Sequence, residues 1–477
     1  MNALTIAWVA LPFLLGFSIY LLPRLARVLS CTIALLSLGY SFACLLAPES
    51  LTIKLLDHFS VTLIIDSLSG YFILTNALVT LAVLFYCWQE QRSAFFYTQM
   101  TILHGSVNAI FICADFISVY VALEVISIAA FLLIAYPRSD RAIWVGLRYL
   151  FISNTAMLFY LVGAVLVYKA NHSFAFAGLA HAPPEAIALI GLGLLTKGGI
   201  FISGLWLPLT HSESATPISA LLSGVVIKAG IFPLLRAALL TEDLTPLLSL
   251  FGIGTAFLGV IGAIAAQDTK RLLAFSTISQ LGFVLVAPGA AGFYALTHGL
   301  AKASLFLIAG NLPSRQLTAL QQQGVPQSLR VPLAIAALSI SGCPLLAGFA
   351  AKSLTLKALL PWQANLLTLA TVGTAIVFAK LLFLPLARAE SKPLRWGLLT
   401  ALGLLAGGIV TLNFWMFDRY MLPELSKAIL VLGAGWLLYW GLIRHRIWQI
   451  SRTLEQLEHL IGMMSIMLVV LFWFVVV

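Results

Sequence analysis

Four lysines lie within long apolar stretches of this chain, where packing alone does not call for a charged side chain. They are Lys197 in GLGLLTKGGIF, Lys228 in GVVIKAGIF, Lys302 in HGLAKASLF and Lys352 in LAGFAAKSL. At the centre of a bilayer each cation costs at least ~2.5–3.5 kcal/mol, even on the mildest insertion scale. Ionisable residues at such depth usually line an ion path or a proton relay, so we expect these lysines to be functional.

Two further ionisable residues complete this set. Glu124, in VYVALEVISI, is the one acid deep within an apolar stretch and the natural counter-charge for a lysine. His298 precedes Lys302 by four residues, so the two share one helix face. Desolvation disfavours the charged form of a lysine, whereas a nearby carboxylate favours it, so movement of an acid drives a proton on or off. With histidine as an intermediate station, the set predicts a proton wire.

Each member of the wire also has a plain structural alternative. Glu124 and Lys197 could form a static buried ion pair, although such pairs are weak evidence for stability. Lys228 could bond carbonyls that are freed near a kink, and His298 could be a satisfied core histidine. The other two lysines could be unpaired structural residues.

Three residues are secondary candidates for the same path: Asp115, Lys270 and His211. Asp115 begins an apolar stretch, which equally suits a charge at a helix N-terminus. Lys270 stands beside Arg271 at the end of another stretch, which equally suits an anchor that fixes topology. A lone histidine on an apolar face, His104, we interpret as part of the core.

The elements that position these residues must be membrane helices. The chain has 477 residues, of which 61% are apolar and only 9% charged, whereas soluble domains carry about 25% charged residues. The mean hydropathy of +1.03 excludes a soluble enzyme and a disordered chain. The net charge of +10 is therefore no sign of nucleic-acid binding and instead fits cytoplasmic loops rich in Lys and Arg.

Sixteen stretches are apolar enough for membrane spans, each of which needs roughly 20 residues. We predict them at 3–22, 28–47, 64–88, 94–113, 115–135, 143–168, 186–206, 215–238, 246–266, 272–288, 290–311, 331–360 (broken at Gly342, Pro344 and Gly348), 364–387, 396–416, 426–443 and 460–477. Loops on one side then carry fifteen Lys or Arg and loops on the other carry six, which predicts both termini on the outer side. Arg148 and Lys380 lie nearer the ends of spans and could snorkel.

Nothing in the sequence points to redox or metal chemistry. The five cysteines are odd in number and form no CxxC pair, which argues against a disulfide framework or a cluster site. No GxGxxG follows a strand. We expect no catalytic residue, metal or cofactor in this chain.

Four segments, in the right order, resemble signatures of the antiporter-like subunits of respiratory complex I, Mrp-type multisubunit Na+/H+ antiporters and membrane-bound hydrogenases. They are LWLPLTHSESATPISALLSGVVIKAGIFPLLR, QDTKRLLAFSTISQLG, HGLAKASLFLIAG and GCPLLAGFAAKS. The resemblance covers roughly residues 60–390. Within the family, the stretch from Ser93 to Tyr136, with Asn108 and Asp115 to Glu124, looks closest to the D subunit of Mrp antiporters. The Pro-Phe-His element of complex I members is absent near Phe201.

The resemblance implies a fold as well as roles. The family core is two inverted five-helix repeats, each with one broken helix, which would here be 93–240 and 241–390. Residues 1–92 would be N-terminal helices, and 391–477 C-terminal helices with an amphipathic linker at 445–459. By the family pattern, Glu124 and Lys197 form a switching pair and Lys352 is the terminal lysine. Lys228 and Lys302 would be central relays with His298 beside them.

We therefore predict a proton-translocating subunit of a Na+/H+ antiporter complex in the cell membrane, with other membrane subunits as partners. The rivals are a pumping subunit of a redox-driven complex, a partner for uptake of another solute such as inorganic carbon, and an idle scaffold. No acidic cluster suited to sodium lies within the spans, since Glu124 and Asp115 have no acidic neighbours there. Either sodium passes through another subunit, or the exchanged ion is not sodium.

Overall fold

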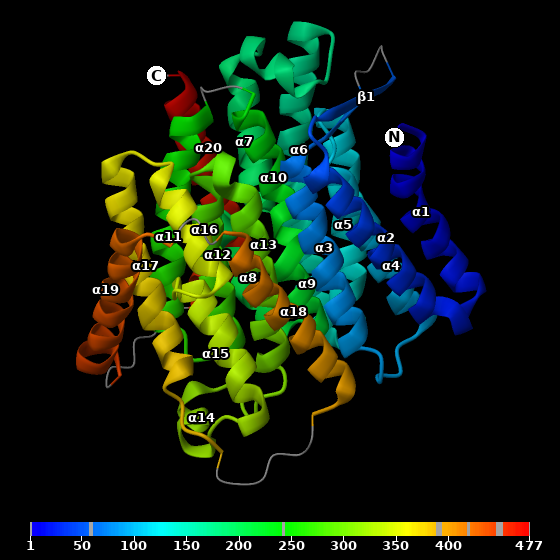
Figure 1. Ribbon diagram of the computed structural model, residues 1–477. Coiled ribbons are helices and arrows are strands. Elements are labelled where there is room, and N and C mark those ends of the chain that lie inside the picture. The colour runs from blue at the N-terminus through cyan, green and yellow to red at the C-terminus, as the bar shows by residue number, and fades with distance from the viewer. Residues whose placement is uncertain are drawn as a thin grey trace.

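The computed structural model describes residues 2–56, 61–240, 244–387, 394–416, 420–444 and 452–476. Most of the chain forms helices that stand side by side (Figure 1). The elements, with η for short 3-10 or π turns, are α1 (Asn2–Leu21), η1 (Pro23–Leu25), α2 (Ala26–Leu46), β1 (Leu51–Leu56), β2 (Val61–Ile65), α3 (Ser67–Tyr86), α4 (Ala94–Ile110), α5 (Phe116–Ile134), α6 (Asp140–Asn171), η2 (Phe176–His181), α7 (Pro184–Lys197), η3 (Phe201–Trp206), α8 (Leu207–Glu213), α9 (Thr216–Leu221), η4 (Leu222–Val226), α10 (Ile227–Ala238), α11 (Thr245–Ala265), α12 (Thr269–Leu285), η6 (Pro288–Ala290), α13 (Ala291–Ala309), α14 (Leu317–Gln323), α15 (Gln327–Ser341), α16 (Ala347–Lys357), α17 (Pro361–Leu382), α18 (Trp396–Trp415), α19 (Leu422–Leu438), η8 (Tyr439–Ile443), η9 (Arg452–Glu455) and α20 (Leu457–Val476).

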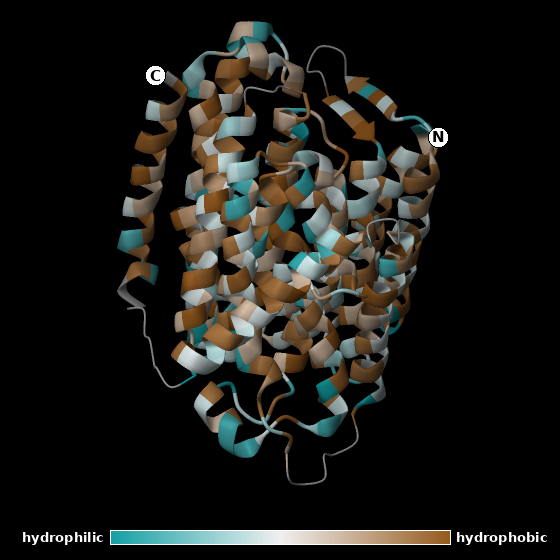
Figure 2. Cartoon of the chain, turned by 60° about the vertical axis from the view of Figure 1, so that its left-hand side comes forward, coloured by the Kyte–Doolittle hydropathy of each residue, from teal (hydrophilic) through white to brown (hydrophobic). Residues whose placement is uncertain are grey.

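The predicted class, an all-helical polytopic membrane protein, is confirmed. In the described residues, 13 helical segments are long and apolar enough to cross a membrane. The other three predicted spans coincide with α4, α12 and the pair α15–α16. Figure 2 shows mostly hydrophobic residues along the flanks and hydrophilic residues gathered toward the two ends.

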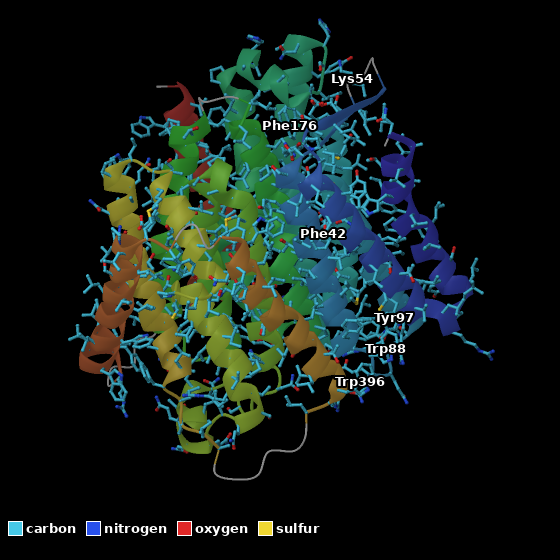
Figure 3. All side chains as sticks on the ribbon, viewed as in Figure 1. Phe42, Lys54, Trp88, Tyr97, Phe176 and Trp396 are labelled. Carbon is cyan, nitrogen blue, oxygen red and sulfur yellow. The ribbon has the colours of Figure 1, made fainter. Side chains whose placement is uncertain are left out.

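The two ends of the bundle carry different features. Lys54 lies at one end, whereas Trp88 and Trp396 lie together near the other (Figure 3), with ring centroids 6.3 Å apart. Tryptophan is enriched at membrane interfaces, so this pair suits one of them. α1 begins and α20 ends toward the end that holds Lys54 (Figure 1). That this end faces outward remains a prediction.

A β-hairpin that the apolar pattern did not predict lies at the same end, and its second strand overlaps the start of the predicted span 64–88. β1 and β2 pair antiparallel, with Leu51 opposite Ile65. The hairpin also bonds the segment before α5, because the Ile64 N–H donates to the Ile112 carbonyl at 2.7 Å. It thereby ties the α2–α3 connection to the start of α5.

The centre of the bundle is formed by α10, α12 and α13, in which every residue is buried. α13 packs against α3, α12, α15, α16 and α18, and so lies inside a ring of helices. Three of the predicted wire residues, Lys228, His298 and Lys302, lie on these central helices. Their depth follows from the position of the helices and not from local sequence.

Two helices are broken, and each break lies beside a lysine of the predicted wire. α7 ends at Lys197 and leads into η3, and α15 ends at Ser341 before α16 begins at Ala347. Each break holds a non-glycine residue with left-handed backbone, Phe201 at φ 51° and Leu345 at φ 69°. Such residues cost about 1–3 kcal/mol and persist only where the surrounding structure enforces them. The predicted break at 342–348 is confirmed.

The C-terminal helix α20 returns to the first half of the chain. It packs against α7 and η3, and so covers the broken helix that carries Lys197. The predicted linker 445–459 falls partly outside the described residues, which resume at Arg452. The predicted boundaries 1–92, 93–240, 241–390 and 391–477 stay a prediction.

Candidate functional site

Lys197 is the last residue of α7 and is held by two serines. Its Nζ donates to the hydroxyls of Ser127 on α5 and Ser153 on α6, which lie 3.0 Å from each other. The ring of Tyr149 lies 5.5 Å from the same nitrogen. The helix break thus delivers an ammonium group to a pocket of neutral oxygens and an aromatic face, where a cation is stabilised without a contacting acid.

Glu124 lies one turn before Ser127 on α5, at the margin of the bundle. No ion pair between Glu124 and Lys197 is found in the described part of the chain, where the Oε1 of Glu124 is buried without a hydrogen-bond partner. Glu124 lines a cavity of about 680 Å³ together with Arg148 and Tyr120. The predicted switching pair is therefore close in the fold but not in contact.

The expectation that Arg148 snorkels to the interface is wrong, because its side chain is buried in the bundle. The side chain is 5% exposed, and its three guanidinium nitrogens have no hydrogen-bond partner among the described residues. It lies in the wall of the Glu124 cavity, which residues of α5, α6 and α20 line. For Lys380 the prediction stands as a prediction: its Nζ donates to the carbonyls of Ile264 (2.9 Å) and Ala266 (2.7 Å), where α11 ends.

Lys228 lies at the start of α10, directly after the π turn η4. Its Nζ donates to the Gly224 carbonyl and, at 3.3 Å, to that of Ser223. A wide π turn frees carbonyls from the regular helix pattern, so this is the arrangement that the sequence analysis gave as the structural alternative. The amino group also faces α13, because a Cβ placed on Gly299 would lie 3.5 Å from it.

His298 and Lys302 lie on the buried helix α13, as their spacing predicted. Lys302 donates to the Leu273 carbonyl of α12 at 3.0 Å, and the ring of Phe378 lies 5.4 Å from its Nζ. Neither ring nitrogen of His298 has a hydrogen-bond partner within the described ranges. The satisfied core histidine that was the alternative is not what the structure has at this position.

Lys352 follows the second helix break and completes the row. With His298, Gln280 and Tyr294 it lines a cavity of about 10 Å³, close to the smallest that holds one water molecule. Lys352 is 5% exposed, and its Nζ lies 5.2 Å from the Phe283 ring. One water in this cavity would join the histidine of α13 to the lysine of α16.

The three secondary candidates have different contacts in the structure. Asp115 caps α5, accepting from the Ser118 N–H at 2.7 Å, and also accepts from the hairpin at the Thr62 N–H. This is the structural role that was its alternative. Lys270 is buried, and its Nζ donates to the Ser214 carbonyl at 2.8 Å. His211 stacks on Phe306 of α13, one turn beyond Lys302, at 5.2 Å.

The structure adds polar residues that sequence reasoning missed. Ser127 and Ser153 bind Lys197, and Gln280 accepts a hydrogen bond from Tyr294 at 2.8 Å beside the small cavity. Neutral hydroxyls and amides are common in membrane helices, so their type carried no signal. Only Ser127 could have been found from its position in the sequence, since it follows Glu124 by three residues and so shares its helix face.

A polytopic helical bundle with a buried row of lysines and one histidine, and with an acid near one end, defines an antiporter-like, proton-translocating class of membrane protein. The sequence profile of the family described as NADH:quinone oxidoreductase/Mrp antiporter, TM, matches residues 113–378. This match spans more than half of the chain, and the chain belongs to that family.

Relatives within the family come from different complexes. The chain is 29% identical over 395 residues to the D subunit of the Na(+)/H(+) antiporter of Alkalihalophilus pseudofirmus, covering 74% of this chain and 80% of that one. It is 28% identical over 348 residues to NAD(P)H-quinone oxidoreductase chain 4 1 of Synechococcus sp. (65% and 66% covered). A chain of the Mrp complex from Dietzia sp. shares the fold, with a TM-score of 0.78, 24% identity, and 93% and 56% covered.

Proposed function

We propose that this chain moves protons across the membrane as one subunit of a multisubunit Na+/H+ antiporter. The path we assign runs through Glu124, Lys197, Lys228, His298, Lys302 and Lys352. The observation that carries the proposal is the depth of this row: its four lysines are at most 5% exposed, and two of them lie on fully buried helices. Deep ionisable groups in a membrane are retained for ion or proton movement.

The contacts of these residues suit proton exchange better than a static ion pair. Lys197 is held by two hydroxyls, which can donate as well as accept, so its bonding can be satisfied in both protonation states. Glu124, which is not bonded to it, can change the charge balance by moving nearer. Loss or gain of that carboxylate favours release or uptake of the lysine proton.

Exchange against Na+ is the finer part of the proposal. It draws on the likeness to one subunit of a Na(+)/H(+) antiporter. Asp115 is committed to a helix N-terminus and the hairpin, so Glu124 alone does not make a sodium site. We assign the sodium path to a partner subunit and the proton path to this chain.

The test measures proton flux in vesicles that contain the whole complex, with a pH-sensitive dye inside. We expect a pH gradient to collapse on addition of Na+, and this response to be lost in Lys197→Ala. Lys169→Gln, at an exposed position on α6, is the matched control that keeps a normal response. Size-exclusion chromatography of both variants shows whether assembly is intact. A normal response of assembled Lys197→Ala would overturn the proton path.

A redox-driven pump is the second candidate, because a quinone oxidoreductase chain is similar over 65% of this chain. The same vesicles separate the two when an electron donor such as NADH is added without Na+. Acidification that depends on the donor and ignores Na+ would assign the chain to a redox pump. Collapse of a pre-formed pH gradient that is triggered by Na+ and needs no donor would assign it to an antiporter.

A further inference from the structure

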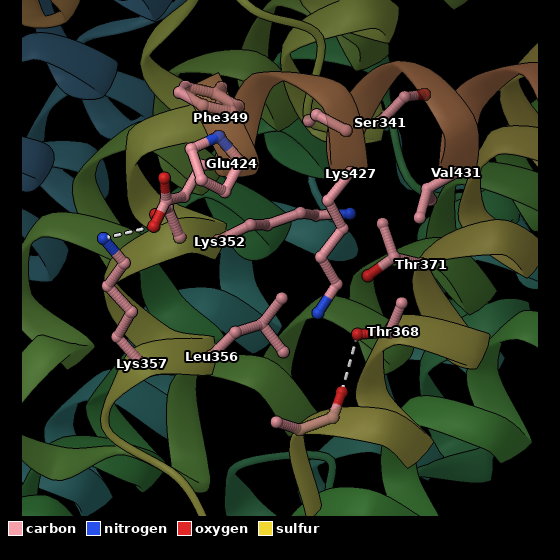
Figure 4. A pocket seen from close by; sticks show the side chains of 15 residues that line it. Ser341, Phe349, Lys352, Leu356, Lys357, Thr368, Thr371, Glu424, Lys427 and Val431 are labelled. Atoms are coloured by element: carbon pink, nitrogen blue, oxygen red, sulfur yellow. Dashed lines mark hydrogen bonds and ion pairs between the residues drawn. The ribbon is translucent and has the colours of Figure 1, made fainter. Parts of the chain in front are cut away.

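A second, larger cavity lies beyond Lys352, between α16, α17 and the helix α19. It measures about 230 Å³. Lys352 lines both this cavity and the small one shared with His298. In Figure 4 the amino groups of Lys352 from α16 and Lys427 from α19 both point into this larger cavity. Two ammonium groups therefore converge from separate helices.

The single carboxylate in the lining is paired through one oxygen, and its Oε2 has no hydrogen-bond partner among the described residues. Glu424 accepts from Lys357 at 2.6 Å, at the edge of the cavity (Figure 4). Lys352 is only 5% exposed, and its Nζ has no hydrogen-bond partner within the described residues. The lining thus carries an excess of positive charge that no acid of the described chain offsets there. Lys352 is the buried member of this set, and a buried charge is usually paired.

Hydrogen-bond donors point to the class of the missing partner. The hydroxyls of Thr368 and Thr371 are spent on helix carbonyls at 2.7 and 2.9 Å. The Ser353 hydroxyl, one residue after Lys352, has no partner in the part of the chain described here. Two ammonium groups and one free hydroxyl form a donor set for an oxyanion. At ~30 Å³ per water, the cavity holds a phosphate-sized group with several waters.

We propose that this cavity binds a phosphate-type oxyanion between Lys352 and Lys427. The same chemistry is supplied by the headgroup of an anionic phospholipid or by free phosphate. α19 is mostly exposed and Lys427 is itself an exposed residue, so the cavity opens to the outside of the described bundle. Resting on the proposed function, we assign the anion a further effect: it favours the charged form of Lys352 and so slows proton release.

The binding test uses the purified complex and two probes. Native mass spectrometry counts phosphatidylglycerol retained after exchange from mixed phosphatidylglycerol–phosphatidylcholine vesicles, and calorimetry titrates inorganic phosphate. We expect Lys427→Gln to weaken binding about tenfold, since one charge-assisted bond is lost. Glu424→Gln frees Lys357 and is expected to tighten binding. Lys54→Gln, at an exposed position of the hairpin, is the control without effect.

The outcomes show whether the anion is a lipid headgroup or a soluble oxyanion, and whether the site exists. Lys427-dependent retention of phosphatidylglycerol without phosphate binding assigns a lipid headgroup, and the reverse assigns a soluble oxyanion. Equal binding of both probes by the native complex and Lys427→Gln would overturn the site. In phosphatidylcholine vesicles, phosphate or added phosphatidylglycerol should slow proton flux in the native complex and not in Lys427→Gln. If binding holds but flux does not respond, the site stands and its assigned effect on the wire is wrong.

Discussion

The ammonium group of Lys197 is bonded by the hydroxyl of Ser127, which lies one helical turn beyond Glu124 on α5. The acid and the hydroxyl share a helix face, but only the hydroxyl contacts the lysine. The lysine is therefore held by a neutral group, and the switching role that we propose for Glu124 is separate from this contact. This separation leads to the first prediction.

Replacing Ser127 by alanine should slow proton flux by roughly tenfold, because a hydrogen bond to a charged group contributes ~1.5–3 kcal/mol. The charged form of Lys197 loses that contribution. Ser153→Ala should act similarly, and the double variant should be less than additive because the two hydroxyls also bond each other. Flux in vesicles measures all three. Ser465→Ala, at an exposed position on α20, is the control, and unchanged flux in Ser127→Ala would remove the anchoring role.

Gly230 is where α10 touches the break that carries Lys197. A Cβ at this position would lie 2.4 Å from the Gly198 nitrogen and 2.7 Å from the Lys197 carbonyl carbon. Gly230→Ala must therefore displace the break, and we expect a loss of ~1–3 kcal/mol in stability together with reduced flux. Thermal unfolding of the purified complex measures the first effect.

Gly403→Ala is the matched control for Gly230→Ala, since nothing lies within 4 Å of a Cβ there. It should leave the midpoint of thermal unfolding and the flux unchanged. If Gly230→Ala behaved in the same way, the close contact between α7 and α10 would not be required for positioning Lys197.

The membrane fold and the burial of the four lysines were predictable from sequence for a physical reason. Burying Lys228 or Lys302 in an apolar helix carries a large penalty, so each stands out against its surroundings. The second break was predictable because Gly342 and Pro344 interrupt an apolar run. The resemblance to a family supplied the order of the residues along the path, which spacing alone does not encode.

Other features depend on contacts between distant segments and left no local signal. Strands β1 and β2 are joined to the segment before α5, and Arg148 of α6 lines a cavity together with residues of α5 and α20. Position near the end of a span predicted snorkelling for Arg148, but the neighbouring helices override that tendency. The packing of α20 against α7 could not be predicted from the sequence either, since it joins residues far apart in the chain.

A pH-dependent contribution to stability is expected from Asp66, at the junction of the hairpin and α3. Burial acts to raise the pKa of Asp66, but hydrogen bonds from Arg236 and the Ser69 N–H, with the charge of Arg236, hold it below its ordinary value of 3.8. Because the pKa of this carboxyl is lowered in the folded state, its charged form stabilises the fold at pH values above 3.8. This contribution is lost as the pH falls through the pKa of the folded state.

Asp66→Asn keeps a good helix N-cap and removes only the charge that faces Arg236. We expect it to lower stability by ~1.5–3 kcal/mol at neutral pH and to match the native protein in strong acid. Unfolding midpoints across that range provide the measurement. Asp140→Asn, exposed at the start of α6, should show neither effect. A difference between Asp66→Asn and the native protein that is constant with pH would contradict the charge-based account.

A buried ion pair joins the segment before α20 to the central helix α12, and we expect the docking of α20 to depend on it. Arg271 donates to both carboxylate oxygens of Glu455, at 2.9 and 2.5 Å, and both residues are at least nine-tenths buried. Glu455→Gln leaves the arginine buried without its anion, so we expect a loss of ~3–5 kcal/mol. Because α20 covers the broken helix of Lys197, proton flux should fall together with stability.

The control is Glu213→Gln, which breaks the more exposed pair with Arg141 at 3.5 Å and should lower stability by no more than ~1 kcal/mol. Equal unfolding midpoints for the two variants would show that the buried pair does not hold α20 in place.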